Sequence, residues 1–280
     1  MIVWISSYPK SGNTWVRALL SSYIYSENGS FDFHYLNKIN QFPKEDYFTQ
    51  FSKNFDSIKE VSKYWIAAQN DINKKNKTIF FKTHSANCII DDNPFTNKEN
   101  TLGIIYIVRD PRNIITSLAN HYEISLDEAY NFFTNERKYI VQKRLKPTMA
   151  NAQVIGSWRH HYLSWRHINF APMKIIKYED LNNNAYDTFI SILKFLNQFM
   201  KIKIDENKIK NTLQSCNFEV LKRKEKEEGF FESPLSKVKN KKISFFHLGK
   251  KNNWKNTLDN NLEEKIRIVF SKEMKELGYL

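Results

Sequence analysis

Short uninterrupted apolar runs alternate along the chain with longer segments in which apolar residues recur every three or four positions. Four runs have strand length and suit strands buried on both faces: residues 2–5, 78–82, 102–108 and 173–177. Helical spacing marks a further set of segments: 15–23, 56–72, 125–145, 151–168, 185–197, 205–214 and 259–276. This alternation predicts an α/β fold, with a central parallel sheet flanked by helices, in a single domain over residues 1–280.

Two long stretches follow neither period. Residues 31–55 are aromatic and polar, and they are predicted to form a loop or short helices. Residues 222–257 are charged and are interrupted by Gly229, Pro234 and Gly249, so a long loop is predicted there. The five aromatic residues of that stretch are too many for a simple linker. We therefore expect it to be a functional loop that covers a cofactor or substrate site.

The composition describes a globular chain with an excess of basic side chains. The formal net charge is +13, with 41% hydrophobic and 15% aromatic residues. Such an excess can attract nucleic acid, an acidic membrane or a phosphate-bearing ligand, or it can reflect a Lys- and Asn-rich composition spread over solvated faces. Only residues 222–224 and 237–242 are clustered. We therefore attribute most of the charge to composition, expect no nucleic-acid partner, and look for a local anion site.

Cysteine usage and hydropathy limit the cellular setting. Cys88 and Cys216 are far apart and neither lies in a Cys-x-x-Cys motif, so neither a disulfide framework nor a zinc site is indicated. Both are predicted to be buried small apolar residues. The first residues lack the pattern of a signal peptide, and no run approaches the roughly 20 apolar residues of a membrane span. We therefore expect a cytoplasmic protein without stable membrane insertion.

The stretch "YPKSGNTW", residues 8–15, lies between the first predicted strand and the first predicted helix. A strand–loop–helix junction directs backbone N–H groups and the helix dipole at a ligand, which favours phosphate or sulfate. Lys10 adds a mobile charge, Gly12 permits close backbone approach, and Thr14 offers a hydroxyl. The ATP-binding P-loop pattern places its lysine after the second of two glycines, whereas here the lysine precedes the single glycine. The motif therefore predicts an anion site that differs from a standard ATP loop.

As a whole, "YPKSGNTW" resembles the phosphosulfate-binding loop of the sulfotransferases that use 3′-phosphoadenosine 5′-phosphosulfate (PAPS). These enzymes transfer a sulfuryl group to an acceptor and release 3′-phosphoadenosine 5′-phosphate (PAP). The resemblance implies that the phosphosulfate end of the cofactor is bound by Lys10, Ser11, Gly12, Asn13 and Thr14. It also implies that the ring of Trp15 stacks on adenine.

The same family has a basic residue and a serine for the cofactor's 3′-phosphate after a later strand. The stretch "IIYIVRDPRNIITSLANHY" supplies Arg109 and, eight residues on, Ser117. Arg109 leaves the carboxyl end of a buried strand, where α/β proteins bind ligands, and a guanidinium there can hold phosphate through two hydrogen bonds. The alternative is structural, an ion pair between Arg109 or Arg112 and a nearby acid.

The family also carries a histidine base after the second strand, and "IFFKTHSANC" supplies Lys82, Thr83 and His84 in the matching places. Sulfuryl transfer requires the acceptor hydroxyl to lose its proton as it attacks sulfur, and a histidine is suited to accept it. Lys10 and Lys82 can compensate the negative charge that builds up during transfer, without a metal.

Weaker matches complete the resemblance. Tyr178 in "KYEDL" corresponds to a tyrosine near the nucleotide, and Phe218 in "NFEVLK" to a second stacking aromatic residue. The helix containing "GSWRHHYLSW" is common in the family, and we expect Trp158 and Trp165 to pack in the core.

The C-terminal motif departs from the family pattern of Arg-Lys-Gly, three residues and Asp-Trp-Lys. In "HLGKKNNWKN", His247 and Leu248 replace the basic pair, whereas the glycine, tryptophan and lysine remain as Gly249, Trp254 and Lys255. The Gly249 N–H can still reach a phosphate, and Lys250 or Lys251 can supply the missing charge from a shifted place. The resemblance therefore implies a rearranged grip on the 3′-phosphate.

Together these matches predict a PAPS-dependent sulfotransferase acting on a hydroxyl, or less favourably an amine, of a small molecule or glycan. Its acceptor pocket is predicted to come from segments that the family does not fix: 31–51, 85–100, 121–150 and 225–247. One alternative is a P-loop-like nucleotide or small-molecule kinase, which needs Mg²⁺ and an acidic ligand at a strand end; only Glu179 and Asp180 could provide it. The second is a non-catalytic nucleotide-binding relative. Acceptor identity and oligomeric state stay open.

Overall fold

Five parallel strands form the centre of the molecule, in the order β2-β3-β1-β6-β9. The structure is a computed structural model that describes residues 1–141, 148–236 and 241–280. The strands are β1 (Ile2–Ser7), β2 (Asn40–Gln41), β3 (Ile79–Thr83), β6 (Thr101–Val108) and β9 (Met173–Lys177). The parallel sheet and all four predicted strands are confirmed. The edge strand β2 was missed, because two residues carry no readable alternation.

Side chains of the central strands alternate between two layers of core. From β1, Trp4 packs into one layer, and Val3 and Ile5 pack into the other. From β6, Tyr106 packs into the same layer as Trp4, and Ile105 into the opposite layer. Both faces of the sheet are therefore covered, which explains why its strands have uninterrupted apolar sequences.

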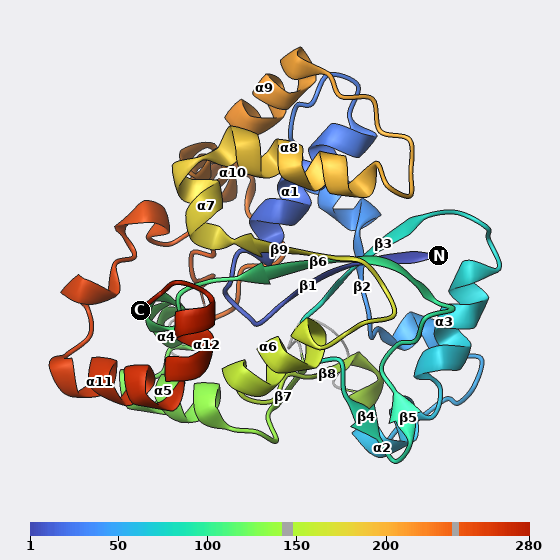
Figure 1. The fold of residues 1–280 in the computed structure, drawn as a ribbon, viewed down its shortest axis with the longest axis horizontal. Helices are drawn as coiled ribbons and strands as arrows, with labels where there is room; N and C mark the ends of the chain where they lie inside the picture. The colour runs from blue at the N-terminus through green and yellow to red at the C-terminus, as the bar shows by residue number, and fades with distance from the viewer. Residues whose placement is uncertain (142–147, 237–240) are drawn as a thin grey trace.

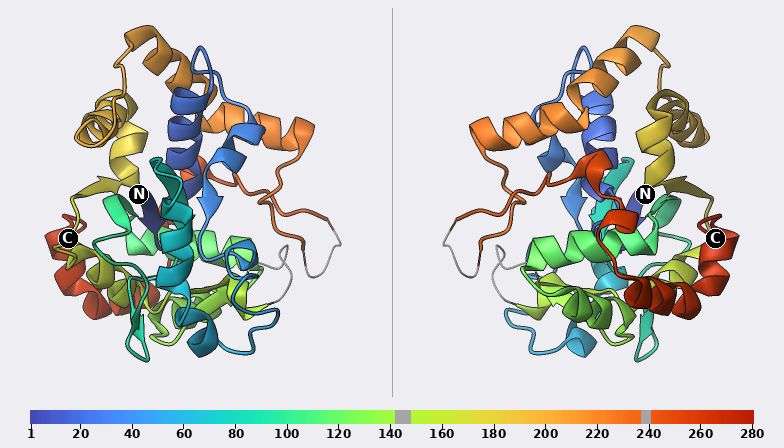
Figure 2. Two further views of the ribbon diagram at one scale, coloured as in Figure 1. Left: turned by 90° about the vertical axis from the view of Figure 1, so that its right-hand side faces the viewer. Right: turned by 90° about the vertical axis from the view of Figure 1, so that its left-hand side faces the viewer.

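Helices cover both faces (Figures 1 and 2). One layer contains α1 (Asn13–Tyr25), α7 (Tyr178–Asn183), α8 (Ala185–Leu196), α9 (Glu206–Ser215) and α10 (Phe218–Glu228). The other contains α3 (Trp65–Asn73), α4 (Pro111–Tyr122), α5 (Leu126–Thr134), α6 (Trp158–Arg166), α11 (Asn260–Val269) and α12 (Ser271–Glu276). The remaining elements are short: α2 (Ile58–Ser62) and the strand pairs β4 (Ile89–Ile90) with β5 (Asn93–Pro94) and β7 (Tyr139–Val141) with β8 (Ala152–Val154).

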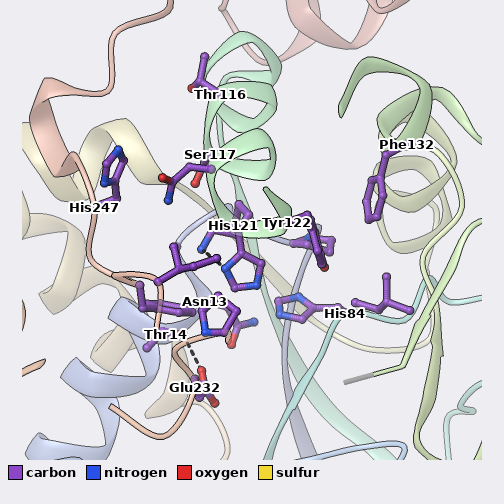
Figure 3. A pocket seen from close by; sticks show the side chains of 18 of the residues that line it. Asn13, Thr14, His84, Thr116, Ser117, His121, Tyr122, Phe132, Glu232 and His247 are labelled. Atoms are coloured by element: carbon purple, nitrogen blue, oxygen red, sulfur yellow. Dashed lines mark hydrogen bonds between the residues drawn. The ribbon is translucent and has the colours of Figure 1, made fainter. Parts of the chain in front are cut away.

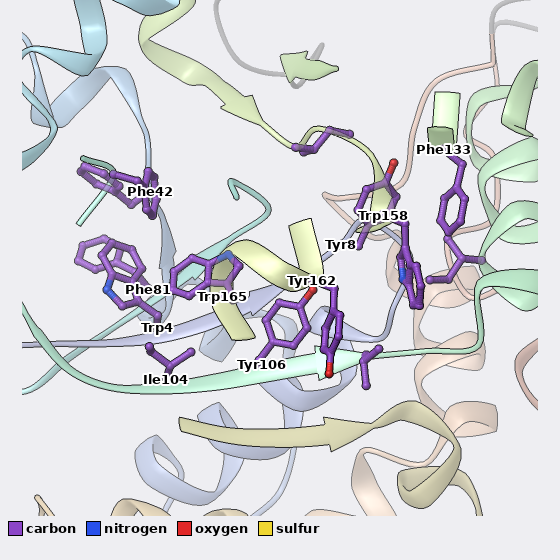
Figure 4. Close-up of a cluster of buried hydrophobic side chains, with 14 of the residues drawn as sticks. Trp4, Tyr8, Phe42, Phe81, Ile104, Tyr106, Phe133, Trp158, Tyr162 and Trp165 are labelled. Carbon is purple, nitrogen blue, oxygen red and sulfur yellow. The ribbon is translucent and has the colours of Figure 1, made fainter. Parts of the chain in front are cut away.

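Aromatic rings dominate the second of these layers (Figure 4). Trp158 and Trp165 are buried there, as predicted, beside Trp4, Tyr106 and Phe133. This layer therefore packs α4, α5 and α6 against one face of the sheet. Of the two cysteines, both free, Cys216 is buried and Cys88 only partly so.

Two helix predictions were wrong in extent. The helix predicted over 151–168 begins only at Trp158, because residues 152–154 form β8, and the Ser157 hydroxyl caps the helix. The helix predicted over 125–145 ends at Thr134, since β7 begins at Tyr139; residues 142–145 lie outside the described part of the chain. Each of these strands has only three residues, which is too short for an alternation to be read.

The loop predicted over 222–257 was also partly wrong. Helix α10 extends through Glu228, so the irregular segment begins at Gly229, and two 3₁₀ turns, Gly249–Lys251 and Trp254–Asn256, interrupt its end. Residues 237–240 of this segment lie outside the described residues. Helix α10 is charged because only Leu221 is fully buried, which masked its helical pattern. Among the residues described, no helix is both long and apolar enough to cross a membrane.

Candidate active site

A cavity of about 1080 Å³ opens where β1, β3 and β6 end. The residues predicted from the sequence converge on it from seven separate places in the chain. Those lining it are Lys10, Gly12, Asn13, Thr14, Trp15, Lys82, His84, Arg109, Ser117, Tyr178, Phe218 and Gly249. The exception is Ser11, a fully buried residue of the loop whose hydroxyl has no hydrogen-bond partner among the described residues. Parallel strands bring their carboxyl ends to one edge, which is why these motifs meet.

The loop between β1 and α1 adopts a conformation that depends on glycine. Gly12 has φ 105°, and a Cβ on it would lie 2.6 Å from Cδ2 of Tyr178. Lys10 is also left-handed, with φ 67°. The Asn13 amide ties the start of α1 back to β1 by donating to the Ile5 carbonyl (3.0 Å). The loop is thereby held against both the sheet and the ring of Tyr178.

Lys10 extends from this loop under the covering segment. Its Nζ lies 3.3 Å from Nδ1 of His121 and 4.2 Å from the centre of the Phe245 ring. Burial, and after it the charge of Arg109, lower the pKa of Lys10 to about 7. His121, at the end of α4, is a cavity residue that the sequence reasoning did not single out.

The two arginines after β6 have different environments. Arg112 bonds to both oxygens of Asp110, contacts Glu263 at 3.2 Å and stacks on Trp254. Arg109 has no carboxylate within ion-pair distance in the described part of the chain; its guanidinium lies 4.1 Å from the Tyr178 ring, and its buried Nε has no acceptor. The structural alternative therefore applies to Arg112, whereas Arg109 faces the cavity.

His84 is held from three directions. Its Nδ1 lies 2.8 Å from the Ser7 carbonyl, which can only accept, so Nδ1 carries the proton and Nε2 is left as the proton-accepting atom. Its backbone N–H donates to the side chain of Gln153 (2.7 Å), and its carbonyl lies 3.1 Å from Nε2 of His161. Burial, and then the charge of Lys82, lower the pKa of His84 to about 3, so the ring is neutral near pH 7.

Glu232 is a site residue that sequence reasoning missed. Its carboxylate accepts from Lys82 (2.9 Å), Arg17 (2.8 Å) and the Thr14 hydroxyl (3.1 Å), as Figure 3 shows in part. Burial alone would raise its pKa, but the two cations outweigh burial and hold it well below the usual range. Nothing in the local stretch "FFESPLS" marks this acid, because its partners lie 150 to 218 residues away.

The aromatic residues predicted to contact adenine lie close together. The Trp15 indole donates to the Cys216 carbonyl and contacts Tyr178 edge to face, with 5.6 Å between ring centres. Phe218 lies against Gly249, where a Cβ would come within 2.5 Å of its ring. Trp15, Tyr178 and Phe218 thus all line the cavity, as Ser117 does.

The C-terminal motif is docked on α4 but brings no lysine into the cavity. Asn252 accepts from Thr116 (2.6 Å), and Gly249 and His247 line the cavity, whereas Lys250 and Lys251 do not. Burial and neighbouring lysines lower the pKa of His247, so it does not replace the lost positive charge.

Only two of the four segments predicted to supply the acceptor pocket contribute to the cavity. Residues of 121–141 and 232–247 line it, but none from 31–51 or 85–100 does, because the aromatic residues of those stretches, such as Phe42 and Phe95, are in the core. Residues 142–147 and 237–240 lie outside the described residues.

Neither of the acids considered for a Mg²⁺ site, Glu179 and Asp180, lines the cavity. Glu179 accepts from the Asp110 N–H (3.1 Å) and from the Tyr279 hydroxyl (3.0 Å), and it does not line the cavity. Within the described ranges, no group of three or more His, Cys, Asp and Glu residues is placed to hold a metal ion. The donors around the cavity, including the Arg109 Nε that has no acceptor among the described residues, instead suit an anionic ligand such as PAPS.

Comparisons with known proteins identify the family. A family model described as "Sulfotransferase domain" matches residues 2–278. The luciferin sulfotransferase of Photinus pyralis is 25% identical over 226 residues, which are 78% of this chain and 56% of that protein. The flavonol 3-sulfotransferase of Flaveria bidentis is 22% identical over 99% of this chain and 82% of its own length.

Among solved structures, mouse sulfotransferase SULT7A1 complexed with PAP has a similar fold. The TM-score is 0.62 at 20% identity, over 97% of this chain and 83% of that one. The match across residues 2–278, together with the shared fold, shows that the chain belongs to the sulfotransferase family of PAPS-dependent enzymes.

Proposed function

We propose that the protein transfers the sulfuryl group of PAPS to a hydroxyl group of a small-molecule or glycan acceptor, with His84 as the base. The observation that carries this proposal is the position of the His84 ring: Nδ1 lies 2.8 Å from the Ser7 carbonyl, so Nε2 is left to accept a proton in a cavity that also holds Lys10 and Lys82. An acceptor amine is less favoured, because a protonated amine would enter a site lined by cations.

Each group around the cavity has a separate task in this proposal. The loop and Lys10 bind the phosphosulfate end, Arg109 and Ser117 bind the 3′-phosphate beside the Gly249 N–H, and the aromatic residues hold adenine. PAPS supplies the activated sulfuryl group when bound. Nε2 of His84 takes the proton of the acceptor hydroxyl, while Lys10 and Lys82 stabilise the negative charge that develops during transfer.

The other end of the cavity supports an acceptor with an apolar body. Its apolar lining comprises Tyr122, Ile124, Phe132, Tyr139, Ile140 and Val141. Lys138 stacks on Phe132, and Asn131 and Asn135 add hydrogen-bonding groups. Rings and aliphatic side chains of this kind suit phenols and the faces of sugars.

The relatives named cytosolic sulfotransferases support a cytoplasmic location.

Calorimetric titration with PAP and with ADP, both without Mg²⁺, tests the cofactor. Much tighter binding of PAP is expected, and equal binding would contradict a 3′-phosphate site at Arg109. Turnover with PAPS is then measured over a panel of phenols, flavonols, sugars and amines. His84→Ala should lower turnover by roughly 10²–10⁴ and preserve PAP affinity. A protein that binds PAP but sulfates none of these acceptors, with or without His84, would favour the non-catalytic alternative.

A further inference from the structure

Glu232 is a buried acid inside a site built for anions. Its side chain is only 7% exposed, and its carboxylate contacts three donors: the Thr14 hydroxyl, the Lys82 ammonium and the Arg17 guanidinium. Thr14 and Lys82 line the same cavity as Lys10 and His84. Figure 3 shows Thr14, Glu232 and His84 in this cavity. Two of the three donors are therefore groups assigned above to the sulfuryl donor or to the charge that develops during transfer.

The hydroxyl of Thr14 cannot donate to the Glu232 carboxylate and to a phosphate group of the cofactor at the same time. It has one proton, which it donates to Oε2 of Glu232 at 3.1 Å. To donate to a phosphate oxygen it must release the carboxylate. Lys82 has three protons and can be shared, but its charge is already offset by Glu232 at 2.9 Å.

Arg17 keeps the carboxylate in place when Thr14 leaves it. This guanidinium is buried, pairs with Glu232 at 2.8 Å and also donates to the Leu36 carbonyl at 3.2 Å. Removing the acid would leave Arg17 as an uncompensated buried charge. The segment that carries Glu232 is fixed on either side, because the Phe230 ring is buried and the Ser233 hydroxyl bonds to Glu225. Glu232 is thus a fixed component of the site.

We propose that Glu232 is an affinity-determining residue: a resident carboxylate that competes with the 5′-phosphate of cofactor and product for Thr14 and Lys82, and so limits how tightly PAP is held. The inference rests on the proposed function, because it assumes that the 5′-phosphate occupies this end of the cavity. Its consequence is faster product release than the cations alone would allow.

Glu232→Gln tests the proposal, since it removes the charge at nearly constant shape. The probes are PAP and adenosine 3′-phosphate, which lacks the 5′-phosphate, titrated separately by calorimetry. PAP binding should tighten by roughly tenfold or more, because a like charge is removed at close range, and binding of adenosine 3′-phosphate should change far less. Glu228→Gln is the matched control, because it makes the same change on an exposed acid at the end of α10 and should alter neither affinity.

The outcomes are distinguishable. Unchanged or weaker PAP binding by Glu232→Gln overturns the inference, as does an equal gain for both nucleotides. If the single variant fails to fold because Arg17 is left unpaired, the double variant Arg17→Met/Glu232→Gln removes both charges, and the same rise in preference for PAP is expected. Absence of PAP binding by the native protein overturns the proposed function and this inference together.

Discussion

Replacing Gly12 by alanine tests whether the loop conformation and the Tyr178 ring are one structural unit. Gly12 has φ 105°, and the added methyl group would lie 2.6 Å from Cδ2 of Tyr178. A non-glycine residue in the left-handed region costs roughly 1–2 kcal/mol. Overpacking against a buried ring adds about 1–3 kcal/mol. The expected loss in the free energy of unfolding is therefore about 2–5 kcal/mol.

The ring cannot yield without disturbing the ligand site. Tyr178 lies 4.1 Å from the Arg109 guanidinium and contacts Trp15, so a displaced ring moves groups assigned to the 3′-phosphate and adenine. Because the displaced groups would meet the ligand less well, PAP binding is expected to weaken, by about tenfold for each 1.4 kcal/mol of binding energy lost. For a chain of this length, the stability loss corresponds to a fall in Tm of roughly 3–8 °C.

Gly278→Ala is the matched control for the cost of placing a non-glycine residue in a left-handed backbone conformation. Gly278 also has a positive φ, 69°, but its nearest neighbour is the flexible end of Lys177, at 3.4 Å. It should lose about 1–2 kcal/mol with PAP affinity unchanged. Thermal denaturation and calorimetric titration measure both variants. If Gly12→Ala lowered Tm no more than Gly278→Ala and bound PAP normally, the packing of Tyr178 on the loop would not constrain the site.

Three further predictions concern charged groups. His84→Ala should lower kcat by roughly 10²–10⁴ and leave the Kd for PAP unchanged, whereas the same change at the half-exposed His160 should alter neither; loss of PAP affinity in the first variant would contradict its role as a base. Arg109→Met should weaken PAP binding at constant Tm, whereas Arg112→Met should lower the free energy of unfolding by about 3–5 kcal/mol. If instead Arg112→Met weakened PAP binding and Arg109→Met lowered the stability, Arg112 would be the ligand-binding residue and Arg109 the structural one. The lowered pKa of Lys10 means that this side chain loses its charge as the pH rises through about 7, so PAP affinity should fall between pH 7 and pH 9. Lys10→Met should flatten this pH profile. An equally steep fall in the variant would show that another group titrates.

Features that depend on neighbouring residues in the chain could be predicted from the sequence. Apolar runs and the loop residues at strand ends predicted the strand before "YPKSGNTW" and the convergence of Lys10, His84 and Arg109. These elements form because local preference and the pattern of burial agree.

Features that depend on distant partners could not be predicted. Glu232 has the same local environment in sequence as many surface acids, and only folding brings it to Arg17 and Lys82. The three-residue strands β7 and β8 pair with each other across an intervening stretch, so neither carries a pattern of its own. Likewise, the distinction between Arg109 and Arg112 depends on Glu263 and on the C-terminal segment, which arrive from the end of the chain.

The electrostatics of the site link the strength of the base to the presence of an anion. In the structure, burial and the charge of Lys82 hold His84 neutral with a pKa of about 3, and burial and the charge of Arg109 lower the pKa of Lys10. Both shifts have a Coulombic part that a neighbouring anion opposes, as Glu232 already does for both groups. An anion bound beside Lys10 and Lys82 therefore raises the pKa of His84 and keeps Lys10 charged. In the proposed mechanism, proton abstraction by Nε2 is therefore more favourable when the donor anion is in place, so that a single set of charges would both bind the donor and activate the acceptor.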